Sequence, residues 1–252
     1  MADRGLDVRR EGAVLRVTLA RPERRNAFDA DLIAALADAF ADVGEARCVV
    51  LAGEGASFCA GADVAWQRAS IDLTYEENVA DSARLLRMLE AVDSCPAPVV
   101  GRIQGHALGG GCGLVACCDV AVASPDAVFG FSEVRLGLIP AVISPLVLPR
   151  IGAAEARRWF LTGERFDAAT ALRIGLVHEI ADDLDAAVTG IVDAVLRGGP
   201  EAVRAAKQLA RERPDGPAAV EIASKLRSGP EGQEGLRAFL EKHPPAWVDS
   251  PD

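Results

Sequence analysis

Residues 105–119 form a glycine-dense stretch whose composition suggests a site. Its centre holds three successive glycines, Gly109, Gly110 and Gly111, followed by small apolar residues. Because glycine costs a helix about 1 kcal/mol relative to alanine, three of them at a helix start indicate bare backbone that approaches another group closely. That group is either a ligand or a neighbouring strand in a tightly packed fold, and the isolated motif favours tight packing.

Glu133 is the carboxylate best suited to acid–base chemistry. It follows an apolar run at 127–131, and apolar surroundings raise a carboxyl pKa toward the range useful for proton transfer. The alternative is a surface carboxylate that follows a strand. Asp119 ends a predicted helix and Asp126 lies in a predicted turn, so structural roles are favoured for both.

The cysteines do not have the spacing of a metal site. None forms a Cys-x-x-Cys pair, and we predict that all are reduced thiols. A site made of Cys59, Cys112 and His106 is disfavoured on spacing, so we expect no metal. The six cysteines are Cys48, Cys59, Cys95, Cys112, Cys117 and Cys118.

Composition excludes several partner classes. The 252 residues are 50% hydrophobic and 5% aromatic, which predicts an aliphatic core, and the net charge is −10 with 37 acidic and 27 basic residues. An acidic chain without a basic stripe is not expected to bind nucleic acid or an anionic membrane. The N-terminus lacks the apolar core of a signal peptide, and no segment approaches the roughly 18 apolar residues of a membrane span. The expected location is the cytoplasm.

Alternating strands and helices must position these residues. Strand–helix repetition predicts right-handed crossovers and a mainly parallel α/β sheet. The core is predicted to span 1–195, and a smaller helical part 196–252. Strands are predicted at 13–19, 48–53, 98–103, 120–123 and 127–131, with helices after Asp29, around 79–89, and throughout most of the chain from 144 onward.

Four segments together resemble the crotonase superfamily, which includes enoyl-CoA hydratases and isomerases. The order and separation of the segments match over nearly the whole chain. The resemblance implies a spiral of ββα units with a C-terminal helical region that trimerises, giving a homotrimer or a hexamer built from two trimers. The segments are 21–28 (RPERRNAF), 57–63 (SFCAGAD), 105–119 and 129–137 (FGFSEVRLG).

The resemblance also implies a chemistry that needs bare backbone. Members of the superfamily bind acyl-CoA thioesters and stabilise an enolate at the thioester oxygen with two N–H donors. By resemblance these donors are the amides of Ala62 and Gly110. Gly110 would start a helix, where free N–H groups and the helix dipole favour an anion. Coenzyme A is part of the substrate, so no separate cofactor is expected.

Other residues are assigned to coenzyme binding by the same resemblance. Ala60 and Asp63 correspond to a segment near the adenine. Arg24 or Arg25 occupies a basic position near the coenzyme phosphates, although either arginine could equally be a solvated loop charge.

The C-terminal region, 196–252, is expected to serve oligomerisation and to cover the coenzyme, while 1–195 forms the spiral core with the acyl-CoA site. Phe239 and Lys242 resemble a pair that contacts CoA, often across a subunit boundary.

One glutamate is missing from the pattern of many hydratases in this superfamily. Those enzymes carry two glutamates that share a water, and here Glu133 is the second while Gly113 stands in place of the first. Because 110 and 113 lie on one helix face, we expect Gly113 to leave a vacancy in the pocket for a branched or carboxylated acyl substituent. Gly109 and Ala141 are expected to line the same pocket.

Residues 137–145 (GLIPAVISP) resemble a bacterial subgroup that hydrates methylglutaconyl- or isohexenylglutaconyl-CoA. We therefore predict an enoyl-CoA hydratase, a lyase of fatty-acid or branched-chain metabolism, that adds water to a 2-enoyl-CoA of branched or glutaconyl type. A Δ3-Δ2-enoyl-CoA isomerase that uses Glu133 alone, a decarboxylase and a non-catalytic acyl-CoA binder remain alternatives.

Overall fold

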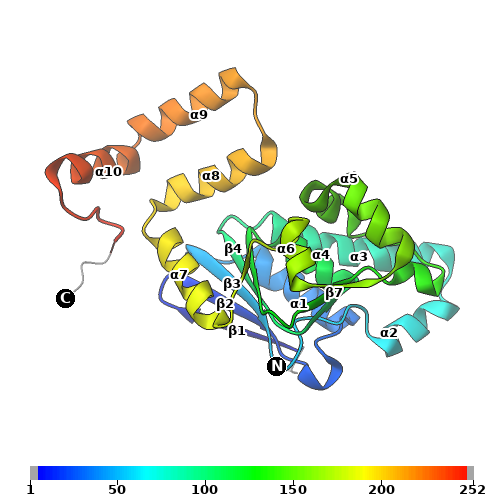
Figure 1. Ribbon diagram of the computed structural model, residues 1–252. Helices are drawn as coiled ribbons and strands as arrows, with labels where there is room; N and C mark the ends of the chain where they lie inside the picture. Colours follow the sequence, from blue (N-terminus) through cyan, green and yellow to red (C-terminus); the bar gives the residue numbers. More distant parts are fainter. Residues whose placement is uncertain (1–4, 249–252) are drawn as a thin grey trace.

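A computed structural model describes residues 5–248, and Figure 1 shows a twisted sheet covered by helices, with a helical extension at its C-terminal end. The six-stranded sheet has the order β1-β2-β3-β4-β6-β9, and only β1 runs antiparallel to its neighbour. A second sheet has the order β5-β7-β8. The strands are β1 (Leu6–Glu11), β2 (Val14–Leu19), β3 (Cys48–Gly53), β4 (Val99–Ile103), β5 (His106–Leu108), β6 (Val120–Ala123), β7 (Val128–Gly130), β8 (Arg165–Asp167) and β9 (Glu179–Ile180).

The chain repeats a strand–strand–helix unit, one strand in each sheet. β4 and β6 are parallel neighbours in the large sheet, and β5 and β7 are parallel neighbours in the small one. Each pair of strands leads into a helix, α4 (Gly110–Cys117) or α5 (Ser144–Thr162). This is the predicted ββα spiral, and the predicted mixed α/β class with a mainly parallel sheet is confirmed.

The large sheet is buried on both faces. Val49 and Leu51 of β3 pack into the main core, while Cys48 and Val50 point to the opposite face. α7 (Leu184–Leu196) covers that opposite face, and α1 (Ala30–Ala41) and α3 (Tyr75–Asp93) pack against each other beside the main core. Burial on both faces explains why β3 is an almost wholly apolar run. All six cysteines are free and buried, as expected for reduced thiols.

Local signals place α1 and α3 correctly. The Asp29 carboxylate accepts the Leu32 N–H at 2.9 Å, which is the predicted N-cap of α1. α3 begins with a capping box between Thr74 and Glu77. The short strands β1, β5 and β8 and the helix α2 (Val64–Ala69) were not predicted, whereas α6 (Ala168–Arg173) lies in the region after 144 that is predicted to be mostly helical.

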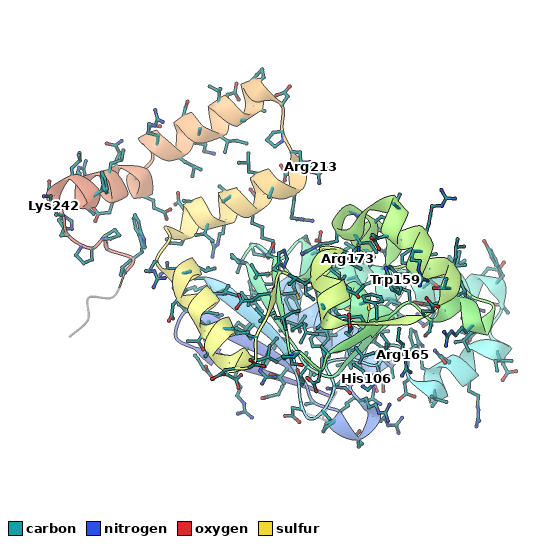
Figure 2. The ribbon with its side chains drawn as sticks, in the orientation of Figure 1. His106, Trp159, Arg165, Arg173, Arg213 and Lys242 are labelled. Carbon is teal, nitrogen blue, oxygen red and sulfur yellow. The ribbon has the colours of Figure 1, made fainter. Side chains whose placement is uncertain are left out.

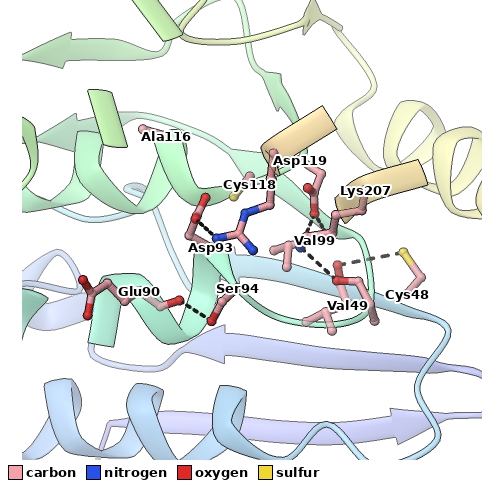
Figure 3. Close-up of polar contacts among 12 residues, drawn as sticks. Cys48, Val49, Glu90, Asp93, Ser94, Val99, Ala116, Cys118, Asp119 and Lys207 are labelled. Atoms are coloured by element: carbon pink, nitrogen blue, oxygen red, sulfur yellow. Dashed lines mark hydrogen bonds and ion pairs between the residues drawn. The ribbon is translucent and has the colours of Figure 1, made fainter. Parts of the chain in front are cut away.

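The C-terminal helices leave the sheet layers after α7. Figure 1 shows α9 (Gly216–Ser228) and α10 (Pro230–Glu241) standing away from the sheets. α8 (Pro200–Glu212) is anchored by Lys207, which donates to Asp119 at 2.7 Å. Figure 3 shows Asp119 between Lys207 and the Val99 amide, so its predicted structural role is confirmed. The predicted division at 195/196 stays a prediction. Within 5–248 no helix is both long and apolar enough to cross a bilayer.

Candidate active site

A cavity of about 700 Å³ opens beside the N-terminus of α4. Loop 60–62, the start of α4, one face of α3 and residues 132–143 form its walls. The structure thereby brings together residues from all four segments that carried the resemblance, with Phe28 contributed by segment 21–28. The predicted site residues that line this cavity are Ala60, Ala62, Gly109, Gly110, Glu133 and Ala141.

Backbone pairing holds the two predicted oxyanion donors at the cavity wall. Leu108 N–H donates to the Cys59 carbonyl at 3.0 Å, which joins loop 59–63 to the strand that leads into α4. Among residues 5–248, neither the Ala62 N–H nor the Gly110 N–H donates a hydrogen bond to another protein group. Two unpaired amides at one cavity wall, one of them at a helix N-terminus, can stabilise a developing oxyanion.

The three glycines are required for different physical reasons. Gly109 has φ 51° and ψ −117°, a conformation that side chains rarely permit. A Cβ at Gly110 would lie 2.8 Å from the Phe28 ring, and a Cβ at Gly111 would lie 2.3 Å from the Cys59 carbonyl oxygen. The sequence left both a ligand and tight packing open as the reason for this bare backbone, and at Gly110 and Gly111 a Cβ would meet protein atoms. Tight packing explains these two.

Glu133 lies where an acid–base group would act. It begins the short 3-10 helix η3 (Glu133–Leu136), and a Cβ built at Gly109 would stand 3.1 Å from its Oε1. Its Oε2 is buried without a hydrogen-bond partner among the described residues. Burial raises the pKa of the Glu133 carboxyl above the ordinary value of 4.5. A desolvated carboxylate of this kind is suited to taking and returning a proton.

Gly113 does not leave the expected vacancy. It is fully buried within α4, and a Cβ there would lie 2.6 Å from Ile143 Cγ2 and 3.5 Å from Leu89 Cδ2. Gly113 is also not among the residues that line the cavity. The prediction that this position holds an acyl substituent is corrected, because the side chain of Ile143 already fills the space. No local sequence signal indicates this contact, because residues 113 and 143 are thirty positions apart.

A second cavity of about 580 Å³ shares Ala60 and Ala62 with the first. Three arginines line it, Arg24, Arg25 and Arg68, and they make it cationic despite the acidic chain. The two adjoining cavities can therefore hold an extended ligand with an anionic end. Arg68 was missed, although Asp63 followed by VAWQRA is an N-cap signal for the helix that carries it.

Asp63 is buried and engaged in structure at the same cavity. It caps α2 by accepting the Ala65 N–H at 2.8 Å, and it accepts from Arg24 at 2.9 Å. Burial alone would raise the pKa of Asp63, but these hydrogen bonds and the Arg24 charge outweigh it and the pKa lies below its ordinary value. The hydrogen bond and charge of Asp63 in turn raise the pKa of Arg24. Its assignment to the adenine side stays a prediction.

The predicted C-terminal pair lies away from both cavities in this chain. Figure 2 shows Lys242 at the far end of the helical extension, whereas His106, on β5, lies in the body of the molecule. Phe239 is 80% exposed on α10, whose contacts are with α8 and α9. One chain therefore does not bring these residues to its own site.

One face of α3 forms a polar wall that the sequence analysis missed. Asn78, Asp81, Ser82 and Leu85 line the larger cavity at helical spacing. The Asp81 Oδ1 accepts from Arg84 at 2.6 Å, and Arg84 itself is exposed. Within the described residues, no lysine, arginine or histidine lines this cavity, so its only charged lining groups are two carboxylates.

Comparison with known proteins agrees with this arrangement. The family model described as "Enoyl-CoA hydratase/isomerase" matches residues 9–250. A crystal structure of an enoyl-CoA hydratase from Shewanella pealeana superposes with a TM-score of 0.92 at 39% identity, covering 96% of each chain. Pseudomonas aeruginosa AtuE has a TM-score of 0.91 at 35% identity, covering 97% of this chain and 100% of its own. Cyclohexa-1,5-dienecarbonyl-CoA hydratase from Thauera aromatica is 34% identical, covering 94% of each chain.

The chain therefore belongs to the enoyl-CoA hydratase/isomerase family and has the crotonase fold. It is an enzyme of that family, and both the predicted superfamily and the predicted class of enzyme are confirmed. The glutaconyl-type subgroup stays a prediction.

Proposed function

We propose that this protein hydrates a 2-enoyl-CoA thioester with Glu133 as its acid–base group. One observation carries the proposal: a buried carboxylate without a partner lies in the same cavity as two unpaired backbone amides. The carboxylate can carry the proton that is transferred in the reaction, and the two amides can stabilise the oxyanion that forms.

The reaction follows from these positions. Glu133 takes a proton from water, the water oxygen bonds to C3 of the substrate, and the C2=C3 electrons move toward the thioester carbonyl. The Ala62 and Gly110 amides hold the resulting enolate oxygen, and such a donor is worth about 3–4 kcal/mol of barrier. Glu133 then returns the proton to C2, giving the 3-hydroxyacyl-CoA.

The adjoining cationic cavity supports placement of the coenzyme there. Arg24, Arg25 and Arg68 would neutralise its phosphates, with Ala60 and Asp63 near the adenine. We propose that no cofactor beyond substrate coenzyme A takes part. In a homotrimer or hexamer, Phe239 and Lys242 of a neighbouring copy would cover the coenzyme, since they do not reach it within one chain.

The acyl group is proposed to be neutral rather than of glutaconyl type. A second carboxylate on the substrate would enter a cavity whose charged lining groups, Glu133 and Asp81, are both acidic. Like charges in a partly desolvated site repel strongly. We expect kcat/KM for glutaconyl-CoA to be roughly tenfold or more below that for crotonyl-CoA, because such repulsion discriminates between ligands.

Isomerisation of a 3-enoyl-CoA is the second candidate, and Ile143 is the observation that favours it. With Ile143 beside Gly113, no second carboxylate stands where the two-glutamate hydratases carry one. A single base suffices to remove a proton from C2 and return it at C4.

The test is incubation with crotonyl-, 3-methylglutaconyl- and cis-3-hexenoyl-CoA in heavy-oxygen water, followed by mass analysis. Incorporation of one heavy oxygen is expected and supports hydration. A moved double bond at unchanged mass supports isomerisation, and loss of carbon dioxide supports a decarboxylase. Acyl-CoA binding without turnover of any of them would contradict the proposal and favour a non-catalytic binder.

A further inference from the structure

Glu133 and Ile143 lie against neighbouring backbone at the start of α4. Gly109 is the N-cap of this helix, and its carbonyl accepts the Gly113 N–H at 3.2 Å, so Gly113 follows one turn later. A Cβ at 109 would meet Glu133 Oε1 at 3.1 Å, and a Cβ at 113 would meet Ile143 Cγ2 at 2.6 Å. Glu133 and Ile143 therefore contact successive turns at the start of α4, and both line the larger cavity.

Ile143 is held firmly in this position. Its side chain is 3% exposed, yet the residue still lines the larger cavity. Its carbonyl accepts the Val147 N–H at 3.0 Å, which fixes it at the start of α5. The wall next to Glu133 is therefore apolar and well packed.

We infer that Ile143 sets the balance between two proton transfers by Glu133. One removes a proton from water and leads to hydration, and the other removes a proton from C2 and leads to isomerisation. The inference rests on the proposed function, in which Glu133 is the acid–base group. A buried water is typically held in place by about three hydrogen-bond partners, within a range of roughly two to four. Ile143 offers none, so an attacking water beside Glu133 lacks a second partner on this side. Proton removal from C2 and its return at C4 need no such partner.

Two nearly isosteric variants test this role. The side chains introduced by Ile143→Val and Ile143→Thr have similar volumes. They differ in that threonine has a hydroxyl where valine has a methyl group. We expect the ratio of kcat/KM for crotonyl-CoA hydration to kcat/KM for cis-3-hexenoyl-CoA isomerisation to be roughly tenfold higher in Ile143→Thr, because the hydroxyl can hold the water for general base catalysis.

Equal ratios in the two variants of an active enzyme would overturn this role alone. A wild-type protein that catalyses neither reaction would overturn the proposed function as well. The two failures are therefore distinguishable.

The packing on which the inference rests is tested without any activity measurement. Gly113→Ala, Ile143→Ala and the double variant form a thermodynamic cycle. We expect Gly113→Ala to lower the melting temperature by several degrees in the wild type and by less in the Ile143→Ala background, where the closest atom, Ile143 Cγ2, is gone and the nearest remaining atom is the Cβ of residue 143 at 3.1 Å. An equal loss in both backgrounds would show that residue 143 does not occupy the space in front of residue 113, and would refute the inference.

Discussion

At the residue scale, the proposed reaction depends on Glu133. Its Oε2 is buried and has no hydrogen-bond partner among the described residues. The carboxylate lies against Gly109, where the absence of a Cβ leaves room for it. Replacing Glu133 by glutamine therefore removes the proposed proton carrier while the volume of the side chain stays nearly the same.

The first prediction concerns catalysis by this residue. Glu133→Gln should lower kcat by about 10²–10⁴-fold, the usual contribution of a general acid–base group. In the wild type, kcat/KM for hydration should rise with pH through the raised pKa of Glu133 and then level off, since the base must be ionised. Steady-state kinetics across pH measure both effects, with acyl-CoA binding by calorimetry as the control. Unchanged turnover in the variant would remove Glu133 from the mechanism.

The second prediction concerns stability. Since the folded-state pKa of Glu133 is raised, the folded chain keeps a proton between the ordinary and the raised pKa that the unfolded chain releases. Stability must therefore fall as pH rises through that window. Glu133→Gln should melt at a higher temperature than the wild type at pH 8, and the difference should disappear near pH 4. A constant difference at both pH values would argue against a buried charge at this position.

At the scale of elements, the glycines of α4 are required because the helix packs closely against neighbouring atoms. Gly111 approaches the Cys59 carbonyl so closely that a methyl group has no place, whereas Gly190 in the middle of α7 has no atom within 4 Å of an added Cβ. Replacing glycine by alanine should therefore lower stability at Gly111 in α4 and raise it at Gly190 in α7.

The third prediction uses this contrast. Gly111→Ala should destabilise the protein by about 1–3 kcal/mol or more, as overpacking against fixed backbone does. Gly190→Ala should stabilise it by about 0.5–1 kcal/mol, since alanine replaces glycine in an open helix position. Urea unfolding of the two variants measures both changes. Equal effects would mean that α4 does not lie directly on the Cys59 loop.

At the scale of the whole molecule, buried charges attach the C-terminal helices to the sheet. Lys207 of α8 is paired with Asp119 at the end of α4 and also donates to the Ala97 carbonyl at 3.2 Å. Arg47, before β3, donates to the carbonyls of Leu196 and Gly198. These contacts set where the extension leaves the core.

The fourth prediction tests that attachment. Lys207→Met should cost about 1.5–3 kcal/mol, because it removes the charged partner of the half-buried Asp119 carboxylate, which among the described residues keeps only the Val99 N–H. Lys225→Met, on the exposed surface of α9, is the matched control and should change stability by less than about 0.5 kcal/mol. Chemical denaturation provides the measurement. A loss as small as that of the control would show that the Lys207–Asp119 pair does not hold α8 to the sheet.

Local signals in the sequence predicted the class of fold and pointed to Glu133 as the candidate acid–base residue. The Asp29 cap, the apolar β3 run and the glycine stretch followed by FGFSE each act over a few residues, so their physical meaning is visible in the chain itself. The missed strands β5 and β8 are short, and their positions depend on pairing with distant segments.

Only the tertiary structure decided what surrounds Glu133. The space in front of Gly113 belongs to Ile143, and Asn78 and Asp81 of α3 line the cavity that Glu133 also lines. None of these neighbours is close in sequence to the residue it meets. The reason is physical: residue type sets what a group can do, whereas its neighbours across the fold fill the space beside it and set its pKa and its access to water.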